Sequence, residues 1–527
     1  MKSVFVNCPL SILLLSLLFA VKALYLAFSI TPLWDIPDET GHFAYVRDLA
    51  DGNGIPLLGD SKIGADIESL AAAGRQRPPA LNWIAQHPPA YYIIAAIPLK
   101  VARSFTKDEQ TLFRLPRIIA ALSGALSLLV VFRILGVFNV EKQSAIAIAS
   151  AIGFIPMFSH LASGTNHDIT LFLFCAIATY YFVHYVKNSK RTDAYLCAAW
   201  LAIAGATKMT AWVLICPMVI ALVFEFNGEL RARFRHAAGI ALTAVSLPTV
   251  WMLRNMFYFG NPLYTAVNDN EMVPTLIEPL QSSFTFYISQ FPILEDFVRH
   301  FYGLVGWAGA GDGIRMIQVG GWPSIIFASA IITATLIIAI QVTRLSISNL
   351  SATGPGCIPT VLANTRVENR SLCCRGRWVY LGAILLGIVF AGLVLTISAK
   401  HTSLSGGMHI LAIALLVFSS AAALPLIFFT TNPEDRCMFY GLVIAAFFIV
   451  VVLYQTYGIY LDVGYPRGIQ GRYFYPIVPL LISSFTIALS RLQISGNLVA
   501  MGVVLLACAE LQAFLNQIIP FYDRAGL

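Results

Sequence analysis

The stretch LSILLLSLLFAVKALYLAFSITPLWDIPDETGHFAY, residues 10–45, joins a long apolar run to a cluster of acidic side chains. The apolar run is long enough to cross the roughly 30 Å hydrocarbon core of a bilayer. Directly after it come Asp35, Asp38, Glu39 and His42. If Asp38 begins a helix, His42 lies one turn further along the same face, an arrangement that suits acid–base chemistry at the membrane surface. The alternative is that Asp38 serves only as the N-cap of a helix that starts at Glu39.

The composition of the whole chain indicates an all-α polytopic membrane protein. Of its 527 residues, 58% are hydrophobic and only 12% are charged, and the mean hydropathy is +0.74. Soluble domains carry about twice that proportion of charged residues. Apolar stretches of about 20 residues recur along the chain, and each is long enough to form a membrane-spanning helix.

The distribution of basic residues predicts the topology. The net charge of +7 is spread over short loops, which is typical of topology signals and does not indicate nucleic-acid binding. The most basic loops are 187–191, 231–236 and 344–377, and we expect all three to be cytosolic. Residues 32–112 and 255–322 then form two long external segments, with juxtamembrane helices in the first of them.

The chain is therefore expected to form a single domain, residues 1–527, with about thirteen membrane-spanning helices and a cytosolic N-terminus. The first helix is expected to be retained, because its apolar run is too long for a signal peptide and has no clear cleavage site. The helix count places the C-terminus outside. The predicted spans are 9–31, 113–137, 143–162, 169–186, 193–207, 209–226, 237–254, 323–343, 378–398, 407–429, 437–456, 474–490 and 496–516.

This topology gathers polar side chains on the external face. They come from QHPPAYY, SGTNHDIT, the turn at ATKMTAW, the helix end at RNMFYFGNPLY, and PRGIQGRYFYP. Each has a structural explanation, since such residues turn a chain, cap a helix or anchor it at the interface. Together they supply a base for a hydroxyl group and cations for a phosphate, which sugar transfer from a lipid phosphate requires. The residues concerned are His87, Tyr91, Asn166, His167, Asp168, Lys208, Arg254, Gln470, Arg472 and Tyr473.

The ordered motifs PDETGH, HPPAYY, NHD, TKMTAW, RNMFYFGNPLY, YGLVGW and QGRYFYP resemble the GT-C superfamily of integral membrane glycosyltransferases, and most closely a bacterial branch that carries the same motifs. More distantly, the chain resembles aminoarabinose transferases and protein O-mannosyltransferases. The resemblance implies the GT-C fold with an active site at the external face. It implies catalytic roles for Asp38, Glu39 and Asp168, with His87 in the place of a positive residue of the family. It implies substrate binding by His42, His87, Tyr91, Asn166, His167, Lys208, Arg254, Tyr302, Gln470, Arg472 and Tyr473.

The resemblance also implies the reaction and its partners. The donor is expected to be a polyprenyl-phosphate-linked sugar, the acceptor a glycan or a lipid-linked molecule, and the transfer inverting. We expect a location in the bacterial inner membrane with a periplasmic active site. No cofactor is expected, although Asp38, His42, His87 and Asp168 are residue types that bind divalent ions. Two alternatives stay open at this point: a flippase for a lipid-linked glycan, and a glycan polymerase or ligase that uses a lipid diphosphate oligosaccharide.

Overall fold

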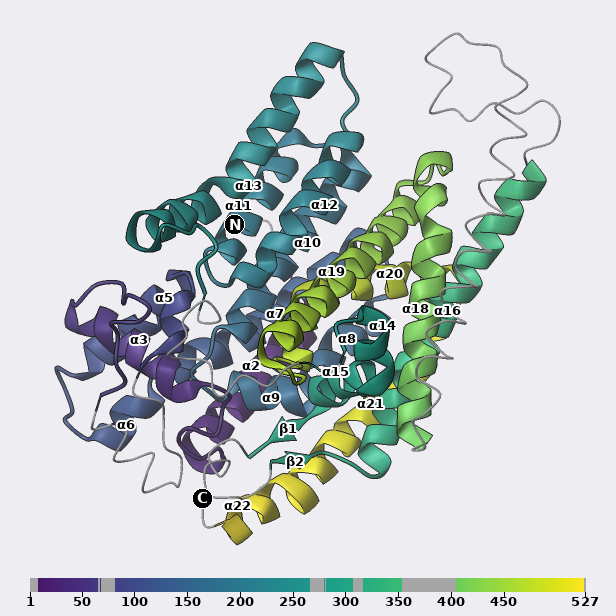
Figure 1. Cartoon of the computed structure of the whole chain (residues 1–527). Helices are drawn as coiled ribbons and strands as arrows, with labels where there is room; N and C mark the ends of the chain where they lie inside the picture. The colour runs from purple at the N-terminus through teal and green to yellow at the C-terminus, as the bar shows by residue number, and fades with distance from the viewer. Residues whose placement is uncertain are drawn as a thin grey trace.

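A computed structural model of the protein describes residues 8–64, 67, 81–265, 279, 281–306, 316–352 and 404–525. These residues are almost entirely helical, and the chain runs repeatedly between two ends of a helix bundle (Figure 1). The first elements are α2 (Leu10–Tyr25), the π-helix η1 (Leu26–Ile30), α3 (Glu39–Asp51), η2 (Trp83–Gln86), α5 (Ala90–Ala102), α6 (Glu109–Arg114), α7 (Arg117–Val137), α8 (Lys142–Ala151), η3 (Ile152–Phe154), α9 (Pro156–Ala162), α10 (Asp168–Asn188), α11 (Arg191–Gly205), η4 (Met209–Ala211), α12 (Trp212–Phe224) and α13 (Leu230–Phe259).

The described residues of the second half of the chain are also mainly helical. A two-stranded antiparallel sheet pairs Leu304 with Gln318 and Val305 with Ile317. The elements are α14 (Phe284–Gln290), α15 (Ile293–Tyr302), β1 (Leu304–Val305), β2 (Ile317–Gln318), α16 (Trp322–Ala352), α18 (Leu404–Phe429), α19 (Pro433–Val463), η7 (Gly471–Ile477), α20 (Val478–Arg491), α21 (Gly496–Ala513), η8 (Phe514–Ile518) and α22 (Ile519–Ala525).

Membrane crossing is supported by the length and composition of these helices. Within the described residues, eight helices are long and apolar enough to cross a bilayer, or nine if one bent pair forms a single span. Helices occupy twelve of the thirteen predicted ranges, and the remaining range, 378–398, lies outside the described residues. The polytopic all-α class is thus confirmed, while the count of thirteen spans stays a prediction.

The predicted span 143–162 is interrupted in the structure. Its two parts, 142–154 and 156–162, meet at an angle of 70°. The break falls at Ile155, which is extended, with φ −91° and ψ 116°. Pro156 follows as the first residue of α9. Proline disfavours a helical conformation at the preceding residue and has no N–H to donate, so the helix ends there and starts again in a new direction.

The described part of residues 32–112, the first segment predicted to be external, contributes a group of short helices at one end of the bundle. Helices α3, α5 and α6 gather there (Figure 1) around their own hydrophobic core, which includes Trp34, Phe43, Tyr92 and Phe113. Helix α5 has 13 residues. Its length is therefore about 20 Å, too short to cross a bilayer.

Helix α10 lies at the centre of the bundle. In its most apolar window, 94% of the residues are buried inside the protein. It packs against α7, α11, α19 and α20. A helix that is apolar all round is stable only when protein or lipid surrounds it, and α10 is surrounded by protein. Its first residue, Asp168, is thereby carried into the protein interior at the end of the bundle where α3 lies.

The opposite end of the bundle carries a second set of ion pairs. Lys187 pairs with Glu434 at 3.1 Å, and Arg436 pairs with Glu225 at 3.0 Å. Arg491 joins Glu434 at 3.4 Å. These residues lie at the ends of α10, α12, α19 and α20. The predicted cytosolic loop 187–191 begins at one of these residues, and the predicted cytosolic loop 231–236 follows α12, which ends next to Glu225. That this end of the bundle is cytosolic stays a prediction.

A charged side chain within the first helix faces another helix. Lys22 Nζ donates to both carboxylate oxygens of Glu510 in α21 at 2.9 Å. It also donates to Ser159 Oγ at 3.0 Å and to the carbonyl of Gly153 at the break between α8 and α9. Charged groups within membrane helices are stable when they are paired in this way, and Lys22 thus links the first helix to the last long helix.

We predict that the end of the bundle carrying α3 is periplasmic. In a variant without the nine native cysteines, Asp60→Cys should react with a membrane-impermeant maleimide in intact cells. Both test positions are exposed: Asp60 follows α3, and Lys190 follows the end of α10 that is opposite to Asp168. Lys190→Cys should therefore react only after permeabilisation, and the reverse pattern of labelling would contradict the topology.

Candidate functional site

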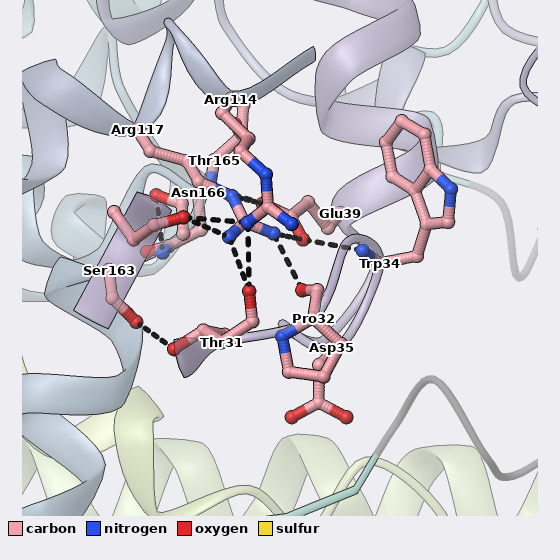
Figure 2. A network of polar contacts seen from close by, with 12 residues as sticks. Thr31, Pro32, Trp34, Asp35, Glu39, Arg114, Arg117, Ser163, Thr165 and Asn166 are labelled. Atoms are coloured by element: carbon pink, nitrogen blue, oxygen red, sulfur yellow. Dashed lines mark hydrogen bonds and ion pairs between the residues drawn. The ribbon is translucent and has the colours of Figure 1, made fainter. Parts of the chain in front are cut away.

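The site is built on a buried ion pair between Arg117 and Glu39. Arg117 Nε and Nη2 each donate to one Glu39 oxygen at 2.8 Å, and both side chains are buried. Glu39 also accepts from the backbone N–H groups of Trp34 at 3.0 Å and Thr165 at 2.8 Å (Figure 2). Four donors therefore occupy the two carboxylate oxygens. This fork geometry is specific to arginine, and it fixes the first turn of α3 against α7 and the loop before α10.

The same guanidinium closes the end of the first helix. Arg117 Nη1 donates to the carbonyls of Ala27 at 2.8 Å and Thr31 at 3.0 Å, and Nη2 donates to that of Pro32 at 2.8 Å. Arg114 Nη1 also donates to the carbonyls of Ala27 at 2.8 Å and Thr31 at 3.1 Å. The last turn of this helix is the π-helix η1. Carbonyls at a helix end need outside donors, and two arginines supply them here.

Asp38 is held next to this pair in an unusual backbone conformation. It is the residue before α3 and has a φ of +63°, in the left-handed region. Its side chain makes no capping hydrogen bond, so capping does not explain this carboxylate. Instead, Asp38 Oδ2 accepts from Arg472 Nη2 at 3.0 Å. A left-handed conformation costs a non-glycine residue about 1–3 kcal/mol, and such residues cluster at functional sites.

Asp168 connects this pair to a second cation. Its Oδ1 accepts from Lys208 Nζ at 2.7 Å, and its Oδ2 lies 3.5 Å from Arg472 Nε. The start of α3, the start of α10, the turn before η4 and the start of η7 therefore meet in one cluster, made of Asp38, Asp168, Lys208 and Arg472. Burial lowers the pKa of Lys208 below its usual range, and the neighbouring Asp168 charge opposes that shift.

A group of histidines and tyrosines borders the acidic and basic cluster. The Tyr92 hydroxyl lies 2.9 Å from Nδ1 of His42 and 2.9 Å from Nδ1 of His167. The His87 ring lies edge-on to that of His167, with 4.6 Å between centroids, and Tyr45 stacks on Tyr92 at 3.9 Å. Burial lowers the pKa of all three histidines, that of His87 to about 3, so the imidazoles are neutral near pH 7.

Most residues of the predicted site lie in or beside this cluster. The Tyr91 ring lies edge-on to that of His167 with 6.5 Å between centroids, and Lys208 Nζ lies over the Tyr473 ring at 4.8 Å. Gln470 is the residue before η7, two positions from Arg472. Asn166 has a local role, because its Oδ1 accepts the Asp168 N–H at 3.0 Å and closes the first turn of α10.

Two predicted residues are located elsewhere. Arg254 donates to the carbonyl of Pro56 at 2.8 Å and lies over the Trp251 ring. Tyr302 stacks on Phe327 of α16, with 4.5 Å between centroids. Neither contact includes a member of the cluster of Asp38, Asp168, Lys208 and Arg472. Substrate-binding roles for Arg254 and Tyr302 stay predictions.

Sequence reasoning did not find Arg117, Tyr92 or the role of Asp35. Asp35 belongs to the acidic stretch of the sequence, yet its carboxylate accepts from the Tyr522 hydroxyl of α22 at 2.7 Å. A signal for Arg117 was present, because an arginine within the first turns of a predicted span needs a buried partner. For Tyr92, the HPPAYY motif placed a tyrosine near His87 but gave no partner. The absence of a required metal also stays a prediction.

Comparisons with known proteins give one family match. A family model described as dolichyl-phosphate-mannose-protein mannosyltransferase matches residues 86–252. This range includes His87, Asp168 and Lys208 but not Asp38 or Arg472. The match supports an enzyme of the membrane glycosyltransferase class. No curated protein matches the chain in sequence.

Two solved structures illustrate the likeness in three dimensions. The structure of ArnT from Cupriavidus metallidurans bound to undecaprenyl phosphate has 14% identity and a TM-score of 0.34, and the alignment covers 94% of this chain and 77% of ArnT. The oligosaccharyltransferase of Archaeoglobus fulgidus in the apo form has 12% identity and a TM-score of 0.38, with 98% of this chain and 55% of that one covered. Both TM-scores are below 0.5, so the functional proposal depends on the family match and the site geometry.

We predict that Arg117→Met strongly destabilises the protein, because it leaves Glu39 as a buried carboxylate without its cation. Breaking such a pair costs about 3–5 kcal/mol. The measurement is the midpoint of thermal unfolding of the purified protein in detergent. The matched control is Arg103→Met, since Arg103 forms a partly exposed pair with Asp51, and exposed pairs contribute about 0–1 kcal/mol. Equal midpoints for the two variants would show that the buried pair does not stabilise the fold.

Proposed function

We propose that the protein is an inverting glycosyltransferase of the GT-C type, which moves a sugar from a polyprenyl-phosphate donor to a hydroxyl group of a glycan or lipid-linked acceptor. The reaction takes place at the periplasmic face of the bacterial inner membrane. The observation that carries the proposal is the meeting of Asp38, Asp168, Lys208 and Arg472, which come from four distant segments. The family match over residues 86–252 supports the same class of enzyme.

Arg472 and Lys208 are the groups that bind the donor phosphate. Both are buried, and both lie beside the Tyr473 ring. Arg472 Nη1 is buried and has no hydrogen-bond partner among the described residues. A buried N–H of a guanidinium without a partner is costly, and a phosphate oxygen is the acceptor that best matches it. As the sugar leaves, charge grows on the phosphate, and these cations stabilise it.

Asp38 is the base for the acceptor hydroxyl. Its side chain is 29% exposed, whereas those of Asp168 and Glu39 are 2% and 1% exposed. An acceptor therefore reaches Asp38 first. Glu39 is saturated by four donors and positions the turn that holds Asp38. Asp168 neutralises the cations and keeps Lys208 in place. The acceptor oxygen attacks the anomeric carbon as the carbon–phosphate oxygen bond breaks, and the bonding electrons leave with the phosphate.

We predict that Asp38→Asn abolishes transfer while the donor still binds. Loss of a general base costs on the order of 10²–10⁴ in rate. The assay is release of polyprenyl phosphate in detergent, with a panel of polyprenyl-phosphate sugars and acceptors. Asp51→Asn is the matched control, because Asp51 is an exposed acid at the far end of the same helix. Near-parental turnover in Asp38→Asn would refute the assignment of the base.

We predict that Arg472→Ala weakens binding of polyprenyl phosphate by about 10- to 150-fold, the equivalent of one hydrogen bond to a charged group. Arg472→Lys should restore part of the affinity, since lysine keeps the charge but not the fork. Arg467→Ala is the control, because Arg467 is an exposed arginine on the same segment. If Arg472→Ala and Arg467→Ala bind the lipid equally well, the phosphate is held elsewhere.

A further inference from the structure

Asp35 is a buried acid that has no part in the chemistry described above. Its Oδ2 accepts from the Tyr522 hydroxyl of α22 at 2.7 Å and from the Gly306 N–H at 3.4 Å. His160 Nε2 lies 3.5 Å from the same oxygen. The side chains of Asp35, His160 and Tyr522 are all buried. The turn after the first helix, α9, the residue after β1 and α22 therefore meet at this carboxylate.

The turn that contains Asp35 also contains Asp38, the proposed base. It runs from Trp34 to Glu39, and two of its residues are in the left-handed region, Trp34 with φ +69° and Asp38 with φ +63°. Such a conformation is rare for a bulky side chain and persists only where the surrounding structure enforces it. Two hydrogen bonds of 3.0 Å close the turn on itself, from the Trp34 N–H to the Glu39 carboxylate and from the Glu39 N–H to the Ile36 carbonyl. The turn is thus a compact unit, and the position of Asp35 affects that of Asp38.

Polar contacts anchor this turn on either side of Asp38. After Asp38, the Glu39 carboxylate is bound by Arg117. Before it, the Asp35 carboxylate is bound by Tyr522. Figure 2 shows the Asp35 carboxylate pointing away from Glu39 and Arg117, so the two anchors hold the turn from different directions. With Glu39 alone fixed, the backbone before Asp38 is free to leave its left-handed conformation, and the Asp38 carboxylate loses its position.

Helix α22 is itself fixed by contacts with the segments that flank the two-stranded sheet. It follows the π-helix η8, in which Gln517 accepts the Gly320 N–H at 2.9 Å and donates to the Gly320 carbonyl at 3.0 Å. Phe521 packs against Gly306, where a Cβ would lie 2.7 Å from two atoms of the Phe521 ring. A π-helical turn changes the direction of the side chains that follow it, and such turns are frequent at functional sites. Tyr522 therefore extends from a fixed helix.

We propose that Tyr522 is a positioning residue for the transfer reaction: through Asp35, it holds the turn in the conformation that presents Asp38 to the acceptor. This proposal rests on the glycosyl transfer proposed above. A displacement of about 1 Å at a reacting group lowers the rate by about 100-fold. The groups proposed to bind the donor phosphate, Lys208 and Arg472, belong to other segments of the chain. Tyr522 therefore affects the rate of transfer and not the binding of the lipid phosphate.

The test is Tyr522→Phe, which removes the hydroxyl that binds Asp35 and keeps the ring. We expect kcat for release of polyprenyl phosphate to fall about 100-fold, while the Kd for polyprenyl phosphate is unchanged. The matched control is Tyr440→Phe, because the buried Tyr440 also donates its hydroxyl to a carboxylate, that of Glu225, at 2.9 Å. This control should keep the parental kcat. Equal kcat values in the two variants, or a joint loss of kcat and lipid binding in Tyr522→Phe, would refute the positioning role.

A second measurement does not require activity. Hydrogen exchange, followed by mass spectrometry on peptides that cover residues 34–39, reports whether the turn is held. We expect its hydrogen-bonded N–H groups to exchange faster in Tyr522→Phe than in the parent protein, and at the parental rate in Tyr440→Phe. If the turn loosens but the parent protein uses no polyprenyl-phosphate sugar, the proposed function fails and the anchor stands. If the parent protein transfers sugar and exchange in Tyr522→Phe is unchanged, only the positioning role fails.

Discussion

The buried pair of Arg117 and Glu39 is the interaction on which the site depends. Two opposite charges in a protein interior lose several kcal/mol each in hydration, and the pair is stable only when its remaining donors and acceptors are satisfied. Here they are: Glu39 accepts from four N–H groups, and Arg117 also donates to three backbone carbonyls. The pair therefore joins the end of the first helix, the start of α3, α7 and the loop before α10 at one point.

This pairing explains how an acid can be held in a strained turn. Asp38 has a left-handed backbone conformation, and the next residue, Glu39, is held in place by its hydrogen bond with Arg117. Its carboxylate is thereby directed to Arg472, far away in the sequence, rather than to the nearby helix end. Two acids and two cations then balance each other in a buried cluster. A ligand phosphate would change that balance, because it competes with Asp38 for the guanidinium.

Hydrophobic patterning predicted the helical class and most helix positions, because each span must satisfy the same length and polarity limits. The distribution of basic residues placed Asp38, Asp168, Lys208 and Arg472 on one face. Hydrophobic patterning did not predict the break at Pro156, since apolarity continues through it. Nor did it predict that Asp35 turns to α22, because pairing across 487 residues depends on packing rather than on local pattern. Arg254 donates to the carbonyl of Pro56, a contact that local pattern did not predict, and its substrate-binding role stays a prediction.

The ion pair of Lys22 and Glu510 has a consequence for biogenesis. A lysine near the centre of a first helix opposes membrane insertion by about 2.5–3.5 kcal/mol on translocon scales. Its partner is 488 residues further along the chain, so at about 5–20 residues per second the ribosome needs roughly 25–100 s to deliver it. During that time the charge of Lys22 in the first helix has no carboxylate partner. Until the last long helix is complete, the ammonium group of Lys22 has only the neutral acceptors Gly153 and Ser159 to bind, and the first helix gains its charged partner last.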